Sequence, residues 1–368
     1  IDGVGVGCLL DAGKAIDFKN SGTGCRLMMG AIAGSACTST LIGDESLSVR
    51  PMDRVVNPLE SMGARISASQ GVTLPLTITG AAQFGQILPI DYVNYKGSAQ
   101  VKSSVLLAGL SARGVTRVKE PIKSRNHTEK LLKTFGAKIL TENLEGVYTV
   151  SIFGGYSLKA ANIEIPADPS SAIFPTVAAL IVPKSEITIR GVGFNSLRIE
   201  CFRILKKMGG KIKIIKNECK ENEEIADIKV ESSELKGIVI EKKLSVMLID
   251  EYPILAIAAS FAKGKTIMKG LGELRYKESN RFETIINGLK ACGVVAHGEE
   301  DDIIIEGNGD LPYGGASIDP QLDHRIAMSF LIMGLSSKHP VEVKGTDTIE
   351  SSFPGFCDLM NSLGATIE

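Results

Sequence analysis

The chain reads MGARI at Met62–Ile66, and the same pattern returns as FGAKI (Phe135–Ile139), MGGKI (Met208–Ile212), CGVVA (Cys292–Ala296) and LGATI (Leu363–Ile367). Each copy places a Gly after a hydrophobic residue and before Ala, Gly or Val. The five glycines are separated by 73, 73, 84 and 71 residues. A period this regular is typical of a chain built from repeated structural units.

The residues around each copy predict a helix followed by a strand. Amphipathic stretches such as Pro58–Met62 and Thr128–Phe135 come directly before the glycine. Gly is the usual residue just past a helix end, so we expect each helix to end there. Alternating segments follow, among them Thr73–Thr79, Val147–Phe153 and Asp302–Glu306, and alternation of this kind indicates strands. The chain therefore reads as five α/β units.

A short polar cluster lies about 40 residues before each glycine and leads into an apolar stretch. The clusters are NSGTGCR (Asn20–Arg26), GSAQVKSS (Gly97–Ser104), DPSSA (Asp168–Ala172), IDEYP (Ile249–Pro253) and LDHR (Leu322–Arg325). Ser, Asp and Pro favour helix starts, so simple N-capping is one interpretation. The other is a binding site, because capping does not require the Arg, Gln, Lys and His that accompany the caps. If the units pack symmetrically, these helix N-termini converge and favour an anionic ligand.

The length of 368 residues predicts two domains, residues 1–164 and residues 165–368, with the break near Asn162–Pro166. We expect a charged, solvated hairpin tip at Lys216–Glu224, which also accounts for the longest spacing between glycines.

Charge and cysteine content exclude several classes of function. The net charge is −1, from 41 basic and 42 acidic residues, so no overall field favours nucleic acid or an anionic membrane. The seven cysteines are scattered and include no CxxC pair, which indicates a reduced, cytoplasmic protein. No run of residues has the spacing of a zinc site. An anionic ligand would have to meet local groups of Arg and Lys.

Seven motifs together closely resemble those of the EPSP synthases, most of all the bacterial class that includes glyphosate-tolerant enzymes. They are NSGTGCRLMMG, GSAQVKSSVLLAGL, SRNHTEKLLKTFGA, DPSSAIFPTVAALIVP, IDEYPILAIAASFA, ELRYKESNRF and LDHRIAMSFLIMGL. The resemblance implies an inside-out α/β barrel of two domains, each with three βαβαββ repeats, and an active site in the cleft between them. Five of the six repeats are expected here, with Gly3–Gly7 as the last strand of a missing first repeat. A PGDKSISHR-like motif of that repeat is absent.

The resemblance also implies a reaction. Members of the family transfer the enolpyruvyl group of phosphoenolpyruvate to the 5-hydroxyl of shikimate 3-phosphate and release phosphate. The two small molecules are the expected partners of a monomeric enzyme, and no metal or organic cofactor is implied.

The resemblance carries over a set of site residues. Asp250, Glu278 and His324 match catalytic positions. The residues that match phosphoenolpyruvate-binding positions are Gly22, Thr23, Arg50, Gln100, Arg281 and Arg325. Those that match shikimate 3-phosphate-binding positions are Ser98, Ala99, Gln100, Arg125, Asp250 and Lys277.

Each catalytic assignment has a simpler alternative. Asp250 could be a helix N-cap, Glu278 a surface carboxylate and His324 a structural histidine. Arginines are usually solvated, but three from three repeats, Arg50, Arg281 and Arg325, are better explained by a site that holds carboxylate and phosphate groups.

Two alternative functions stay open. A UDP-N-acetylglucosamine enolpyruvyl transferase shares fold and donor, but its members often carry a Cys in the loop that reads GDESLSVRP here. The other alternative is an inactive fragment that retains partial substrate binding, because the first repeat is expected to be missing.

Glyphosate-tolerant relatives carry Ala at the position of Gly22. Because the methyl group of that Ala is absent here, comparison with these relatives implies a glyphosate-sensitive enzyme.

Overall fold

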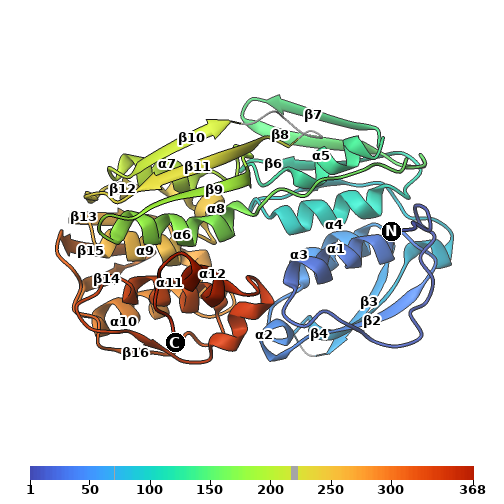
Figure 1. The fold of residues 1–368 in the computed structure, drawn as a ribbon. Coiled ribbons are helices and arrows are strands. Elements are labelled where there is room, and N and C mark those ends of the chain that lie inside the picture. Colours follow the sequence, from blue (N-terminus) through green and yellow to red (C-terminus); the bar gives the residue numbers. More distant parts are fainter. Residues whose placement is uncertain (70, 217–222) are drawn as a thin grey trace. The chain divides into compact units, whose positions relative to one another are not determined.

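The computed structural model describes residues 1–69, 71–216 and 223–368 (Figure 1). The chain forms two compact units, Ile1–Ile163 and Glu164–Glu368. Most of the charged hairpin tip expected at residues 216–224 lies outside the described residues. No described helix is long and apolar enough to cross a membrane.

Unit 1 contains two sheets with the same strand arrangement, β1-β2-β4-β3 and β5-β6-β8-β7. In both, the first strand is parallel to the second and the other pairings are antiparallel. The strands are β1 (Ile16–Asp17), β2 (Thr38–Ile42), β3 (Arg65–Ser69), β4 (Thr73–Thr79), β5 (Asp91–Val93), β6 (Val115–Glu120), β7 (Ile139–Leu144) and β8 (Val147–Phe153). The helices are α1 (Gly22–Ala33), α2 (Glu45–Ser48), α3 (Asp53–Ser61), α4 (Ala99–Gly109) and α5 (His127–Thr134), with a 3₁₀ turn η1 (Ala81–Phe84).

Unit 2 contains three sheets, in the orders β10-β11-β9, β12-β13-β15-β14 and β16-β17. Their strands are β9 (Glu186–Gly193), β10 (Lys211–Lys216), β11 (Ile225–Glu231), β12 (Val239–Ile240), β13 (Lys263–Met268), β14 (Val295–Glu299), β15 (Asp302–Asn308), β16 (Ser317–Ile318) and β17 (Glu342–Val343). The helices are α6 (Pro169–Ile181), α7 (Glu200–Lys207), α8 (Ser245–Leu248), α9 (Tyr252–Ser260), α10 (Arg281–Ala291), α11 (His324–Gly334) and α12 (Phe356–Ser362). Three 3₁₀ turns complete it, η2 (Lys242–Leu244), η3 (Gly272–Tyr276) and η4 (Thr346–Ser351).

Apolar helices form the interior of each unit. In unit 2, α6, α9 and α11 pack against one another (Figure 1), and all nine residues of α9 are buried. A helix that is apolar on every side is stable only where every side is covered. In unit 1, α1 packs so closely on α4 that a side chain at Gly30 would collide with the main chain of Ser104. Each unit therefore buries its apolar helices and presents their polar N-terminal clusters.

The recurring glycines end helices, as predicted. Each follows the C-cap residue of a helix, and their φ angles run from 78° to 102°, where Gly alone is unstrained. The glycines are Gly63, Gly136, Gly209, Gly293 and Gly364. The strands predicted at Thr73–Thr79 and Val147–Phe153 are confirmed as β4 and β8, and the one at Asp302–Glu306 lies within β15.

Two strand predictions are wrong. Residues 365–368, after the last recurring glycine, form no strand. Gly3–Gly7 is also no strand, because Gly5 and Gly7 adopt positive φ angles of 91° and 71° and the segment ends in a turn. Extended backbone requires negative φ, so the alternation of Gly and Val there is not a strand signal.

Candidate functional site

Two groups of polar side chains collect at helix starts, one in each unit. In unit 1 the group surrounds the start of α1 and comprises Asn20, Thr23, Arg26, Arg50 and Gln100, here called the arginine group. In unit 2 it surrounds the starts of α9, α10 and α11 and comprises Asp250, Lys277, Glu278, Arg281, Asp323 and Arg325, here called the carboxylate group. Each is described within its own unit.

Gln100 connects α1 and α4 in the arginine group. Its amide nitrogen donates to Thr23 Oγ1 at 2.7 Å, and its amide oxygen accepts from Arg26 Nη1 at 2.9 Å. Arg26 Nη2 also donates to the main-chain oxygen of Pro51 at 3.1 Å. These bonds fix the Arg26 guanidinium beside the helix start. The sequence singled out an arginine in this cluster that capping does not require, although the resemblance assigned Arg26 no substrate.

Arg50 is held by the loop that precedes α1 and by α2. Its Nη2 donates to Asn20 Oδ1 and to Ser46 Oγ, both at 2.9 Å, and the residue is only 8% exposed. Asn20 is in turn oriented by Asp44, whose carboxylate accepts from Asn20 Nδ2 at 2.9 Å. The guanidinium is therefore oriented before any ligand arrives, as a bidentate anion site requires.

Gly22, the first residue of α1, lies between the two arginines. A Cβ there would stand 2.9 Å from Arg26 Nη1 and 3.2 Å from Arg50 Nη1. The absence of a side chain therefore allows both guanidinium groups to approach the first residue of α1 closely.

The other predicted residues of unit 1 lie at the starts of α4 and α5. Ser98 is the N-cap of α4, and its hydroxyl accepts from Val101 N at 3.4 Å. Ala99 is the first residue of that helix, and Arg125 lies partly exposed two residues before α5. Ser98 is thus the N-cap of α4 and also a member of the polar cluster at that helix start.

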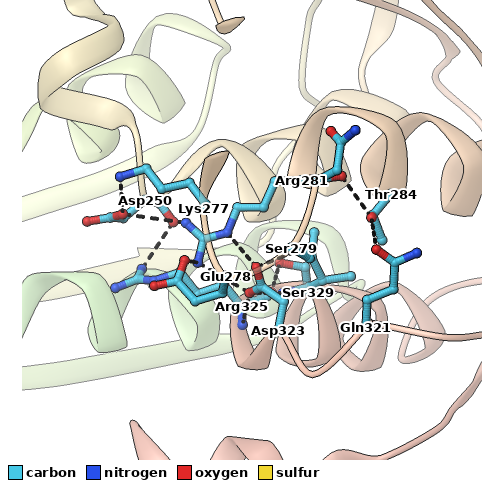
Figure 2. A network of polar contacts seen from close by, with 12 residues as sticks. Asp250, Lys277, Glu278, Ser279, Arg281, Thr284, Gln321, Asp323, Arg325 and Ser329 are labelled. Atoms are coloured by element: carbon cyan, nitrogen blue, oxygen red, sulfur yellow. Dashed lines mark hydrogen bonds and ion pairs between the residues drawn. The ribbon is translucent and has the colours of Figure 1, made fainter. Parts of the chain in front are cut away.

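Arg281 is the centre of the carboxylate group (Figure 2). It is fully buried, and its Nε and Nη2 donate to the two oxygens of Asp323 at 2.7 and 3.2 Å. Glu278 Oε2 lies 2.6 Å from Arg281 Nη2, and Asp250 Oδ1 lies 3.5 Å from Nη1. Burial alone would lower the pKa of Arg281, but Asp323, Glu278 and Asp250 outweigh it and raise the pKa.

Asp250 is not the N-cap residue of α9, so the N-cap alternative is wrong for this residue. The N-cap of α9 is Glu251, and no side chain caps that helix end. The Asp250 side chain, 19% exposed, lies 3.8 Å from Lys277 Nζ and faces Arg281 (Figure 2). Its main-chain oxygen accepts from Arg325 Nη1 at 3.1 Å. Asp250 is thus a fixed carboxylate with one side open to solvent.

A second chain of contacts holds Arg325. Its Nη1 lies 3.8 Å from Glu251 Oε1, and the buried Glu251 accepts a very short hydrogen bond from Ser170 Oγ. Arg198 donates to Ser170 Oγ at 2.6 Å and to Asp168 at 2.9 Å. Burial raises the pKa of Asp168, but Arg198 and Arg325 outweigh it and leave the pKa below its ordinary value.

His324 is the first residue of α11 and is uncharged at neutral pH. Burial, reinforced by Arg325, lowers its pKa to about 4. A neutral imidazole can donate or accept a hydrogen bond there, but it lacks the second ring proton that an imidazolium gives up as an acid.

The structure places Gly22, Thr23, Arg50 and Gln100 around one helix start in unit 1, and Asp250, Lys277, Glu278, Arg281 and Arg325 in one group in unit 2. The other predicted residues of unit 1, Ser98, Ala99 and Arg125, lie at the starts of α4 and α5. Asp323, Asn20 and Glu251 are additions that the sequence did not single out. Asp323 looks like an ordinary N-cap and is one, since its Oδ1 accepts from Arg325 N and Ile326 N. Asn20 and Glu251 likewise lie inside recognised motifs without a signal of their own. Among the described residues, no group of three or more His, Cys, Asp or Glu could hold a metal ion.

Comparison with known proteins agrees with this chemistry. A family profile described as EPSP synthase (3-phosphoshikimate 1-carboxyvinyltransferase) matches residues 4–360. A 3-phosphoshikimate 1-carboxyvinyltransferase of Parvibaculum lavamentivorans is 48% identical over 367 residues, which is 100% of this chain and 81% of the relative. One from Pseudomonas sp. strain PG2982 is 47% identical over 370 residues, covering 100% of this chain and 82% of the relative.

Solved structures give the same result. An EPSP synthase from Acinetobacter baumannii superposes with a TM-score of 0.83 at 41% identity, over 96% of this chain and 80% of that one. The enolpyruvyl transferase NikO from Streptomyces tendae has a TM-score of 0.72 at 15% identity, over the same shares of the two chains, which shows likeness of fold alone. The predicted α/β enolpyruvyl transferase fold is confirmed.

Proposed function

The chain belongs to the EPSP synthase (3-phosphoshikimate 1-carboxyvinyltransferase) family, and we propose that its arginine and carboxylate groups hold the substrates of that family's reaction. The enzyme transfers the enolpyruvyl group of phosphoenolpyruvate to the 5-hydroxyl of shikimate 3-phosphate, in the shikimate pathway. The comparisons do not favour a UDP-N-acetylglucosamine transferase or an inactive fragment. What remains to be assigned is the role of each residue.

Asp250 takes the proton of the 5-hydroxyl. The observation that carries this assignment is its geometry, a carboxylate that is 19% exposed and lies 3.8 Å from Lys277 Nζ and 3.5 Å from Arg281 Nη1. A general base must be within reach of its proton and held in one orientation. Arg325 fixes the Asp250 main chain, and Lys277 stabilises the carboxylate form.

Glu278 delivers the proton to the methylene carbon of phosphoenolpyruvate. In the structure its carboxylate is engaged by Arg281 at 2.6 Å. A substrate carboxylate that binds Arg281 must compete with Glu278 and Asp250 for the same guanidinium. Of these two carboxylates, Asp250 lies farther from Arg281, at 3.5 Å, so we expect the substrate carboxylate to replace Asp250 more easily than Glu278.

The remaining cations and helix starts bind the anionic groups. Arg50, Arg281 and Arg325 bind phosphoenolpyruvate, with Gly22, Thr23 and Gln100 at the start of α1 and beside it. Ser98, Ala99, Gln100, Arg125 and Lys277 bind shikimate 3-phosphate with Asp250. Helix N-termini and oriented guanidinium groups both favour phosphate and carboxylate. His324, neutral at physiological pH, contributes a hydrogen bond rather than a proton.

A phosphate-release assay on the full-length enzyme tests the function. We expect release from phosphoenolpyruvate that depends on shikimate 3-phosphate and not on UDP-N-acetylglucosamine. The reverse dependence would overturn the proposal. We also propose a cytoplasmic monomer without nucleic acid or membrane partners, on its net charge of −1. Light scattering of the purified enzyme tests the monomer.

A further inference from the structure

Unit 1 buries an ion-pair cluster that the proposed reaction does not use. Lys102 Nζ, one turn into α4, lies 2.8 Å from Glu120 Oε2 at the end of β6 and 2.8 Å from Glu129 Oε1 on α5. The exposed fractions of the three side chains are 0%, 0% and 3%. Burying such groups costs free energy that apolar side chains of similar size would not cost. A buried lysine with two glutamates therefore calls for a reason other than packing.

Glu120 is the member of this cluster that reaches the substrate-binding turns. Its Oε1 accepts from Asn94 Nδ2 at 2.9 Å and from Ser124 Oγ at 2.6 Å. Its Oε2 accepts from Lys102 Nζ at 2.8 Å and from Ser124 N at 3.3 Å. Two carboxylate oxygens thus satisfy four donors from three different segments.

Asn94 connects Glu120 to the start of α4 through hydrogen bonds of its side chain. Its Nδ2 also donates to the main-chain oxygen of Ser98 at 2.9 Å, and its Oδ1 accepts from Ser98 N at 3.2 Å. The side chain of Asn94 therefore clamps both main-chain groups of the N-cap residue, which Ala99 and Gln100 follow. On the other side, Ser124 comes directly before Arg125.

We propose that Glu120, held by Lys102, is a positioning residue that orients the shikimate 3-phosphate-binding turns at Ser98–Gln100 and Arg125. The proposal rests on the function proposed above, which assigns those turns to that substrate. Glu120 acts through Asn94 and Ser124, and Lys102 fixes Glu120 in the one orientation that serves both. Glu129 adds a second carboxylate beside Lys102. Among the described residues, no hydrogen bond joins the Glu129 side chain to either turn.

The charge balance of the cluster is compatible with an anionic ligand nearby. Burial raises the pKa of Glu129 against the pull of Lys102, which weakens its negative charge relative to that of a solvated glutamate. Tyr148, whose ring lies 5.6 Å from Lys102 Nζ, is neutral because burial raises its pKa to about 12. Lys123, 4.3 Å from the same ring, adds a positive charge.

The matched pair Glu120→Gln and Glu129→Gln tests the proposal. Both substitutions remove one carboxylate from the same buried cluster. Gln at position 129 keeps an oxygen that accepts from Lys102. Gln at position 120 has one acceptor oxygen for four donors, so the hold on Asn94, Ser124 or Lys102 must be lost. Steady-state KM values for each substrate and melting temperatures are measured on the full-length enzyme.

We expect Glu120→Gln to raise the KM for shikimate 3-phosphate about tenfold, with the KM for phosphoenolpyruvate within about twofold of wild type, since a tenfold change corresponds to about 1.4 kcal/mol of binding. Glu129→Gln should leave both KM values within about twofold. If both variants change both KM values alike, or if Glu120→Gln changes neither, the positioning role is wrong.

A second variant covers the case in which Glu120→Gln does not fold. Asn94→Ala removes the clamp on Ser98 without uncovering a buried charge, and it should give the same selective rise in the KM for shikimate 3-phosphate. A folded Asn94→Ala enzyme with unchanged KM would overturn the proposal. Wild-type enzyme that releases no phosphate with shikimate 3-phosphate would instead overturn the proposed function, so the two failures are distinguishable.

Discussion

Replacing Asp323 by Ala should destabilise unit 2 more than removing either of the other two carboxylates that contact Arg281. Asp323 is fully buried and binds the fully buried Arg281 through two hydrogen bonds, at 2.7 and 3.2 Å. Removing one partner of a buried ion pair costs about 3–5 kcal/mol. Arg281 would keep only Glu278 and Asp250, whose side chains are partly exposed, and would lose its one fully buried carboxylate partner. The same carboxylate caps α11, which contributes about 1 kcal/mol more. We therefore expect a loss of about 4–6 kcal/mol.

Glu278→Gln is the matched control, because Glu278 binds the same guanidinium with a side chain that is 20% exposed. Because Gln keeps an oxygen that can accept from Arg281 Nη2, its loss should be smaller, about 1 kcal/mol. Native-state hydrogen exchange measured on peptides of α10 and α11 reports the free energy of opening of this region without assuming that both units unfold together. A loss below about 1 kcal/mol for Asp323→Ala, or equal losses for the two variants, would refute the buried-pair reasoning.

Three further sets of variants test the site. Asp250→Ala should lower kcat by about 10²–10⁴-fold, whereas Arg325→Ala should mainly raise the KM for phosphoenolpyruvate; a normal kcat in the first would exclude Asp250 as the base. Gly22→Ala places a methyl group 2.9 Å from Arg26 Nη1 and 3.2 Å from Arg50 Nη1, so it should raise the inhibition constant of glyphosate, the longer ligand, more than the KM for phosphoenolpyruvate. Wild-type enzyme unaffected by millimolar glyphosate would contradict this. The folded pKa of His324, about 4, lies below its ordinary 6.5, so the unfolded chain binds the proton first and stability falls as pH drops from 6.5 toward 4. The loss is about 2 kcal/mol at pH 5 and should be absent in His324→Gln when urea midpoints at pH 7 and pH 5 are compared.

The fold could be predicted from local signals because each of them acts within a few residues. The backbone just past a helix end often takes a positive φ angle, which Gly adopts without strain, and all five recurring glycines have positive φ. The polar clusters start helices for the same local reason. The prediction failed at Gly3–Gly7, where alternation of Gly and Val satisfies a strand pattern but Gly5 and Gly7 take positive φ. Glycine fits many conformations, so a glycine-rich alternation carries little information.

The contacts inside the site could not be predicted from local patterns, because they join residues far apart in the chain. Arg281 and Asp323 are 42 residues apart, Arg325 and Asp250 are 75 apart, and Arg26 and Gln100 are 74 apart. The resemblance singled out Arg281, Arg325, Asp250 and Gln100, but it did not single out Asp323 or Arg26. Asp323 was missed because its motif already had a sufficient explanation as a helix cap.

Helix capping and site chemistry are not alternatives at these helix starts, although the sequence presents them as such. Asp323 uses Oδ1 to cap α11 and both oxygens to bind Arg281. Ser98 caps α4 while its main chain is clamped by Asn94. Asp250, which the sequence also allowed as a cap, is not the N-cap residue of α9, and its carboxylate lies beside Lys277 and Arg281. A polar residue at a helix start whose side chain joins a group of ion pairs is therefore a candidate for chemistry whether or not it also caps the helix.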